Sequence, residues 1–588
     1  MAFLETWPIF VPVEAPVRSS TEAVTTWVAA RWTAIASCTI VVSVIGYVQA
    51  VNLASWPTLA NDDEGTYMAR AWAVQTGRGA HHSLANYTYW YDHAPLGWIQ
   101  LVPWTWLTDA YRAGGEADIA GRRIMVGYAL VSTLLVYIIA RRLGCSKPVS
   151  LAAMALFGLS PVSVDYLHQI FLDCIGLPWI LAAFALALSP KRHLWAFAAS
   201  GACFAVAVLS KETYLLWAPA LVYQVWQRAD RRTRAMCLVA FSSVAAALLA
   251  VYPLYALLKG ELFPGRGHVS LIGAIEWQLA SRSSSGSAFS AASDAHAKVL
   301  GWYHDDRWLV GGGILALIPA AATRRLRPVA AGVLVPALYV MHGGYLPAMY
   351  VIGVLAFEAL IIACSAQTLW RLDPLGRIAT ALRQSAVTGR VLGLRMRSHV
   401  RLSLAISWGR LAWRALLLAV LVPLSAEVVP AWGTADSATT YDVNTALFQS
   451  EQWVEQHVPK TDPVLVDANV WIDLVDDGAA PSKVVWFWEL SADPDVGRRY
   501  PEGWRQMDYI VVTNTIRVNL LSEYSSVAPV AQAAAHSTLV VRFGTGTNFV
   551  EIRRIHPYSR TTSNPPWWLP GYGKLRPPTS GPEKGEQL

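Results

Sequence analysis

The chain has 588 residues, of which 54% are hydrophobic and only 15% are charged, and its mean hydropathy is +0.34. This composition excludes an ordinary soluble protein and indicates a protein that crosses a membrane several times. The net charge of +7 does not indicate nucleic-acid binding, because the basic residues gather between apolar runs, where membrane orientation and anionic lipid headgroups account for them.

Apolar runs that can cross a bilayer recur over most of the chain. Several have only about 15 residues, so they must be extended by polar neighbours, tilted or partly re-entrant. The sequence therefore predicts a polytopic α-helical membrane protein with about 11–13 transmembrane helices. Eleven spans are placed at residues 31–52, 122–140, 149–164, 174–189, 194–209, 213–227, 235–258, 308–322, 329–342, 345–364 and 411–430.

The charges between these runs predict how the chain is oriented. Clusters of Arg and Lys follow every second run, and the positive-inside rule places them, with the tail 1–30, in the cytoplasm. The first long loop, 54–121, and a region at 436–555 then lie outside, and residues 436–554 carry 16 acidic against 9 basic side chains. We predict a multi-pass protein of the cytoplasmic membrane. Its six cysteines all fall in or beside apolar runs, which indicates neither a disulfide framework nor a zinc site.

The first outer loop begins with a group of carboxylates, Asp62, Asp63 and Glu64, directly after the first span. Acidic residues in a first turn and a closing glycine predict a helix from Asp63 to Gly77. Carboxylates where a chain leaves the bilayer suit acid–base chemistry on a substrate held at the membrane surface. An aromatic and acidic turn, Tyr91-Asp92-His93-Ala94-Pro95-Leu96, follows in the same loop.

Several cationic residues are placed at the predicted outer surface. Arg122 and Arg123 open the second span on the side that the positive-inside rule disfavours. Paired guanidinium groups suit phosphate binding, although arginines that snorkel at a helix end give the same pattern. Lys211 lies between two spans, where an ionisable group indicates function, and pairing with Glu212 is the alternative.

After the last predicted span, β-rich and helical stretches alternate. This pattern predicts an α/β domain at 436–555, outside the membrane, followed by a disordered tail at 556–588. The expected strands are Val464–Val466, Val484–Phe487, Tyr509–Thr513, Thr538–Phe543 and Phe549–Ile552, and the expected helices are Thr445–His457 and Ala528–Ala535.

The order of these features resembles the GT-C class of integral-membrane glycosyltransferases, in particular the protein-O-mannosyltransferase and aminoarabinose-transferase branch. The resemblance covers about residues 30–360, and the C-terminal domain resembles, more loosely, those of actinobacterial members. Its motifs are Asp63-Glu64, the turn from Tyr91 to Gly97, Leu172-Asp173 before Leu177-Pro178-Trp179, and Leu209-Ser210-Lys211-Glu212-Thr213. Two departures are His93, where the family has Lys, and Ala94, where it has Pro. An imidazole in place of a fixed cation is expected to weaken donor-phosphate binding or make it pH-dependent.

The resemblance implies transfer of a sugar from a polyprenyl-phosphate donor to a hydroxyl of a protein, cell-wall glycan or lipid acceptor. It makes Asp63 the candidate general base, against the alternative of a helix-capping carboxylate. Glu64 would support Asp63, and Asp173 would be a second catalytic acid that binds the acceptor or orients the base, against the alternative of a residue that caps its span. No cofactor is required, although Mg²⁺ or Mn²⁺ at Asp62, Asp63 and Glu64 is an open option. The remaining expected substrate-binding residues are Tyr67, Asp92, His93, Arg122, Arg123, Lys211 and Tyr345, the last in an outer turn where the family carries an aromatic donor-site residue.

Two other functions remain open at this point. A transporter of lipids or glycans would use the acids as a proton relay, but the acids cluster at one surface and the sequence shows no internal repeat. A catalytically silent assembly protein on the same fold is the other, since a fold does not determine a function.

Overall fold

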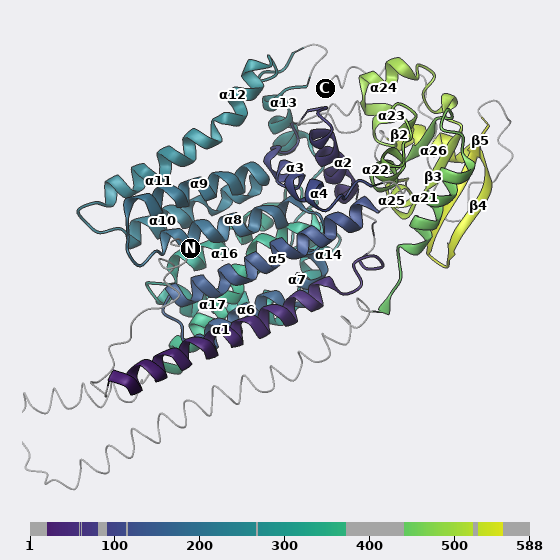
Figure 1. Ribbon diagram of the computed structural model, residues 1–588. Coiled ribbons are helices and arrows are strands. Elements are labelled where there is room, and N and C mark those ends of the chain that lie inside the picture. Colours follow the sequence, from purple (N-terminus) through teal and green to yellow (C-terminus); the bar gives the residue numbers. More distant parts are fainter. Residues whose placement is uncertain are drawn as a thin grey trace, which may run out of the picture.

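The computed structural model describes residues 20–57, 59, 62–79, 91–112, 116–265, 269–371, 440–520 and 527–556. The last predicted span, the basic segment 372–410 and the tail from residue 557 lie outside these ranges. A bundle of helices forms one part of the molecule, and a smaller part with a β-sheet lies at one end of it (Figure 1).

The bundle is built from apolar helices. Within the described residues, four helical stretches are long and apolar enough to cross a membrane: Trp32–Ala50, Ala117–Arg142, Arg234–Leu258 and Ala348–Arg371. Five shorter apolar stretches accompany them. The first ten predicted spans each overlap a helix. The helices are α1 (Ser20–Ala50), α5 (Ala117–Arg142), α6 (Lys147–Gly158), α8 (Leu172–Ala187), α9 (Leu194–Ser210), α10 (Ala218–Arg228), α11 (Arg234–Leu249), α12 (Val251–Leu258), α15 (Gly312–Ala322), α16 (Arg327–Met341) and α17 (Ile352–Arg371).

Small residues let these helices approach closely, as is usual for helix pairs in membranes. Gly201 of α9 faces the backbone of Phe241 in α11, and a Cβ atom added at Gly201 would lie 2.2 Å from the Phe241 carbonyl oxygen. Side chains on the outside of the bundle remain apolar, as at Trp32, Ile40 and Leu258, which is the surface that lipid would cover.

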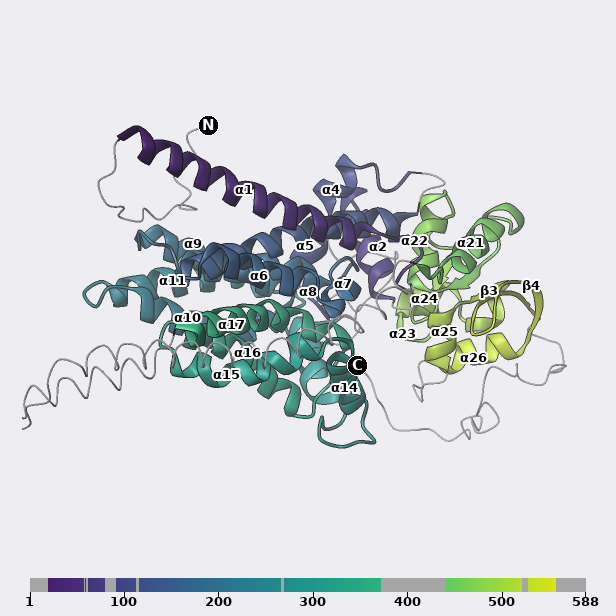
Figure 2. The ribbon, with the colours of Figure 1, turned by 90° about the horizontal axis from the view of Figure 1, so that it is seen from below.

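Short elements gather at the end of the bundle that faces the sheet (Figures 1 and 2). They include α2 (Asp63–Gln75), α3 (Leu96–Ile99) and α4 (Val102–Leu107) from the first loop. The predicted helix that opens at Asp63 is therefore present, and Gly77, with φ +74°, follows its end. The 3₁₀ helices η1 (Glu212–Trp217) and η4 (Ala348–Val351) precede α10 and α17.

The C-terminal part contains a mixed five-stranded sheet in the order β2-β1-β3-β5-β4. Strands β1, β2 and β3 pair in parallel, whereas β5 pairs antiparallel with β3 and β4. All five strands overlap the predicted ones, and α21 and α26 have the predicted bounds. The elements are α21 (Thr445–His457), β1 (Val464–Val466), α22 (Ala468–Asp476), β2 (Val484–Trp486), α23 (Glu489–Ala492), α24 (Pro494–Arg499), η5 (Gly503–Gln506), β3 (Tyr509–Val512), α25 (Asn514–Leu520), α26 (Ala528–Ala535), β4 (Ser537–Thr545) and β5 (Asn548–Ile555).

The sheet part packs directly on the helix that begins at Asp63. The backbone N–H of Gly65 donates to the Asn469 side-chain oxygen of α22 at 2.9 Å. A Cβ atom at Gly65 would lie 2.4 Å from backbone atoms of Ala468 and Asn469, so only glycine permits this approach. The docking of α22 therefore sets the position of the first turn of α2.

Candidate active site

The three adjacent carboxylates of the first loop occupy three different environments. Asp62 accepts hydrogen bonds from the Ala468 backbone N–H at 3.0 Å and from the Trp486 indole at 3.1 Å, both in the C-terminal part. Burial and the neighbouring Asp467 carboxylate raise the pKa of Asp62 well above its usual range. Asp62 thus joins the first loop to the sheet.

Glu64 is enclosed in the membrane part and paired with Arg122. The two side chains are both 0% exposed, and the Arg122 guanidinium donates to both Glu64 oxygens, at 2.6 and 2.9 Å. Arg122 also donates to the carbonyls of Leu53 and Pro57 at 2.9 Å. This bidentate pair fixes α2 against α5, and substrate binding by Arg122 stays a prediction.

Asp63 is left as the half-buried carboxylate between Asp62 and Glu64. Its two neighbours are bound by opposite parts of the molecule, and a Mg²⁺ or Mn²⁺ site at these three residues stays a prediction. Asp63 interacts electrostatically with Tyr67, one turn along α2, and with Lys211.

The aromatic turn of the first loop is held by buried partners. Asp92 accepts from the Arg70 guanidinium at 3.3 Å, and Arg70 lies over the Trp98 ring at 4.6 Å from its centroid. The same Asp92 oxygen accepts from the His93 backbone N–H at 3.0 Å, and the Tyr252 hydroxyl donates to the His93 carbonyl at 3.1 Å. The Asp92 carboxylate therefore orients His93, and its contacts are with the protein.

His93, Lys211 and Glu212 form one polar group. The Lys211 ammonium lies 3.2 Å from His93 Nε2, and His93 Nδ1 lies 2.9 Å from a Glu212 oxygen. Since an ammonium only donates, Nε2 accepts from Lys211 while Nδ1–H donates to Glu212. Lys211 is 5% exposed and lies 5.9 Å from the Tyr350 ring centroid. A buried lysine is thus present beside His93.

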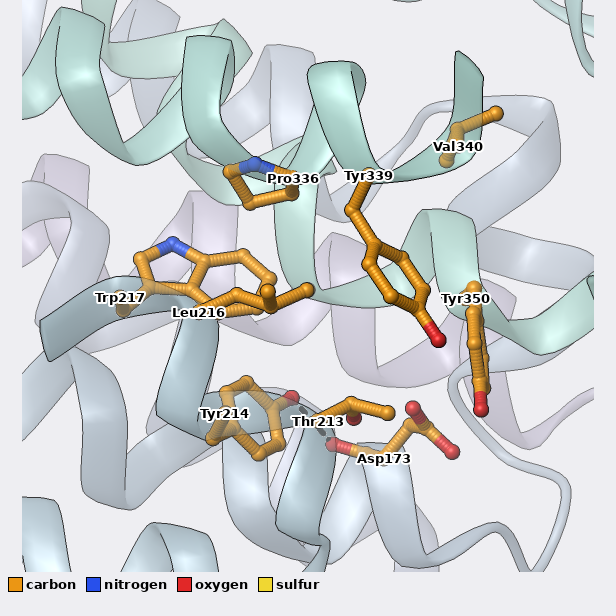
Figure 3. A pocket seen from close by; sticks show the side chains of 10 residues that line it. Asp173, Thr213, Tyr214, Leu216, Trp217, Pro336, Tyr339, Val340 and Tyr350 are labelled. Carbon is orange, nitrogen blue, oxygen red and sulfur yellow. Dashed lines mark hydrogen bonds between the residues drawn. The ribbon is translucent and has the colours of Figure 1, made fainter. Parts of the chain in front are cut away.

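Asp173, at the start of α8, opens into a pocket next to this group. The pocket is lined by Asp173, Thr213, Tyr214, Leu216, Trp217, Pro336, Tyr339, Val340, Tyr350 and Gly353. The carboxylate of Asp173 and the hydroxyls of Tyr339 and Tyr350 gather at one end of it (Figure 3). The Tyr214 hydroxyl donates to the Asp173 carbonyl at 2.5 Å, and Asp173 interacts electrostatically with Lys211 and His93.

Of the other expected residues, Tyr67 is the one that lies beside His93. Tyr67 is buried, stacked on Trp98 at 6.4 Å and 6.3 Å from the His93 ring, so it belongs to the site. Arg123 is exposed on α5. Tyr345 packs under the Arg282 guanidinium, which lies 3.5 Å from its ring centroid.

Sequence reasoning missed the partners that organise the site. Tyr350, which lies five residues after the Tyr345 that was singled out from sequence, contacts Lys211. Arg70 and Tyr252 hold the aromatic turn. An arginine in the middle of the apolar-faced α2 was an available signal, because a buried charge requires a partner. The role of α22 had no comparable signal.

Comparisons with known proteins agree with this architecture. Residues 110–256 match the family model of the dolichyl-phosphate-mannose-protein mannosyltransferases. This segment is a quarter of the chain and includes Asp173, Lys211 and Glu212. Among curated proteins, none matches the sequence.

Two solved structures share the fold. ArnT from Cupriavidus metallidurans in the apo state is 16% identical, with a TM-score of 0.52, over 91% of this chain and 99% of that one. The apo oligosaccharyltransferase of Archaeoglobus fulgidus is 12% identical, with a TM-score of 0.50, over 85% of this chain and 73% of that one. The predicted fold class, a GT-C membrane glycosyltransferase fold with a C-terminal sheet, is thereby confirmed.

Proposed function

We propose that this protein, which has the fold of the GT-C membrane glycosyltransferases, transfers a sugar from a polyprenyl-phosphate donor to a hydroxyl acceptor at the outer membrane surface. One observation carries the proposal: the buried Lys211 ammonium lies within electrostatic range of the Asp63 and Asp173 carboxylates, beside a pocket that Asp173 lines together with apolar side chains. Two carboxylates around one buried cation provide a base, an acceptor-binding group and a phosphate-binding group within one site.

The reaction assigns each group a step. The Asp63 carboxylate takes the proton of the acceptor hydroxyl as its oxygen attacks the anomeric carbon. The bond between that carbon and the phosphate oxygen breaks, and the electron pair leaves with the polyprenyl phosphate. The Lys211 ammonium stabilises the charge that develops on this phosphate, which accelerates the step because the interaction strengthens toward the transition state.

The polar group around Lys211 prepares it for this role. Glu212 holds His93, and His93 Nε2 accepts from the ammonium, which fixes the direction of the Lys211 side chain. His93 is therefore in contact with a buried lysine, which would supply positive charge to a bound phosphate.

The pocket beside Asp173 suits the first part of a prenyl chain. Leu216, Trp217 and Pro336 line one side of it, whereas Tyr339 and Tyr350 lie at the polar end with Asp173 (Figure 3). Asp173 and Tyr67 remain on the Asp63 side, where they would bind acceptor hydroxyl groups. The alternative of a transporter is not favoured, because these ionisable groups gather at one end of the bundle and not at its middle.

The proposal is tested by offering purified protein in lipid nanodiscs a panel of polyprenyl-phosphate sugars with crude acceptor extract. The readout is free polyprenyl phosphate for the wild type and for Asp63→Asn. Asp294→Asn is the matched control, because Asp294 is a peripheral carboxylate paired with Lys298. We expect release with one donor, unchanged in the control and lost in Asp63→Asn. Release that persists in Asp63→Asn would contradict the assignment of the base.

A further inference from the structure

Four carboxylates meet where α5 begins and the C-terminal part docks. Glu116 precedes α5 and Asp118 lies in its first turn, while Glu451 comes from α21 and Asp473 from α22. We call these four residues the interface acid cluster. Ligand oxygens of Glu116, Glu451 and Asp473 all lie within 4.8 Å of one another.

The cluster is buried and short of partners. Glu451 is 6% exposed and Asp118 is 1% exposed, and none of their four carboxylate oxygens has a hydrogen-bond partner in the described part of the chain. Within these same ranges, no Lys, Arg or His forms an ion pair with any of the four. Buried carboxylates in this state require either protons or a cation.

The carboxylates of the interface acid cluster repel one another and are poorly solvated. Burial raises the pKa of Glu451 and of Asp473 well above the usual range, and the neighbouring carboxylates raise both further. The Ala117 backbone N–H, which donates to Asp473 at 2.8 Å, offsets only part of this effect. A divalent ion would remove the repulsion between the groups and satisfy the oxygens without partners.

We propose that the interface acid cluster binds one hard divalent cation, with Ca²⁺ as the best fit. Oxygens on opposite sides of a Ca²⁺ ion lie about 4.6–5.2 Å apart, and those around Mg²⁺ about 4.0–4.2 Å apart. The three oxygens lie within 4.8 Å of one another, which both ions allow. Mg²⁺ gives up its waters reluctantly and is rarely held by protein ligands alone, so a buried set of protein carboxylates favours Ca²⁺. All the candidate ligands are carboxylate oxygens, which disfavours zinc and copper in comparison with calcium.

The ion would join two parts of the protein that are far apart in sequence. Glu116 and Asp118 belong to the start of a membrane-spanning helix, whereas Glu451 and Asp473 belong to the C-terminal part. Helix α22, which supplies Asp473, also contacts Gly65 beside the candidate base. The site is separate from Asp63, and its existence does not depend on the proposed transfer reaction.

The test measures thermal unfolding and metal content of the purified full-length protein. Protein stripped with a chelator is titrated at neutral pH with CaCl₂ or MgCl₂, and bound metal is counted by mass spectrometry after desalting. We expect one bound ion per chain and a rise in Tm of roughly 5 °C with Ca²⁺. The variants Glu451→Gln and Asp473→Asn should lose both responses. Glu489→Gln, another buried carboxylate of the C-terminal part with an oxygen lacking a partner, should keep them.

Glu451→Gln also separates binding from damage to the fold. Because it removes a repelling charge, its Tm without metal should equal or exceed that of the stripped wild type. Absence of any response in the wild type would overturn the proposal and assign the cluster to shared protons. A response that persists in Glu451→Gln and Asp473→Asn would overturn it too, because the ion would then bind elsewhere.

Discussion

The substitution Gly65→Ala tests whether docking of α22 controls the candidate base. The added methyl group would lie 2.4 Å from the backbone of Ala468 and Asn469, whereas ordinary contacts begin at about 3.4 Å. Two backbones must therefore separate by about 1 Å, and such a displacement near a reacting group costs about 100-fold in rate. Overpacking of this kind also destabilises a protein by about 1–3 kcal/mol.

The assay compares donor turnover and Tm for Gly65→Ala, Gly127→Ala and the wild type. Gly127 is the matched control, because it lies on α5 and a methyl group added there would meet no atom within 4 Å. We expect turnover to fall about 100-fold in Gly65→Ala and to stay near the wild-type value in Gly127→Ala. A Gly65→Ala rate within twofold of wild type would refute the reasoning that α22 positions Asp63.

Three further outcomes follow from the same geometry. Arg122→Met leaves Glu64 buried without its partner, so it should lower the free energy of unfolding by about 3–5 kcal/mol, as measured by denaturant titration; an unchanged midpoint would contradict the enclosed pair. Lys211→Met should lower kcat/KM for the donor by about 10–100-fold, the equivalent of one charge-assisted hydrogen bond. An equal loss in the control Lys298→Met, at a peripheral lysine, would contradict a specific role of Lys211 in binding the phosphate. Burial raises the pKa of Asp493 to about 7, so its contribution to stability is present in full below the unfolded pKa near 4 and is lost as the pH rises through 7. The stability of Asp493→Asn relative to wild type, measured by thermal unfolding, should therefore increase from pH 4 to pH 8. A difference that stays constant over this range would contradict the raised pKa.

The local elements could be predicted because their signals are local. Acidic residues before an apolar-faced stretch, closed by Gly77, predict α2, and the alternating β-branched runs predict the five strands. Long apolar runs likewise predict the helices of the bundle, since a bilayer requires them. These patterns are set by residues a few positions apart.

The organisation of the site depends on contacts between distant residues. Asp62 meets Trp486, and Gly65 meets Asn469, across about 400 residues of sequence, a separation that no periodicity reports. The adjacent Arg122 and Arg123 of α5 look alike in sequence, yet Arg122 faces Glu64 in the interior and Arg123 is exposed. Which side of a helix is buried decides between them, and that depends on packing.

The central claim is that Asp63 acts in the chemical step and not in donor binding. The most direct measurement compares kcat with the donor dissociation constant for wild type and Asp63→Asn, using the donor that supports release of polyprenyl phosphate. We predict that kcat falls by about 10²–10⁴-fold, the usual contribution of a general base, while donor affinity changes by less than about threefold. An unchanged kcat, or a loss confined to donor affinity, would contradict the account.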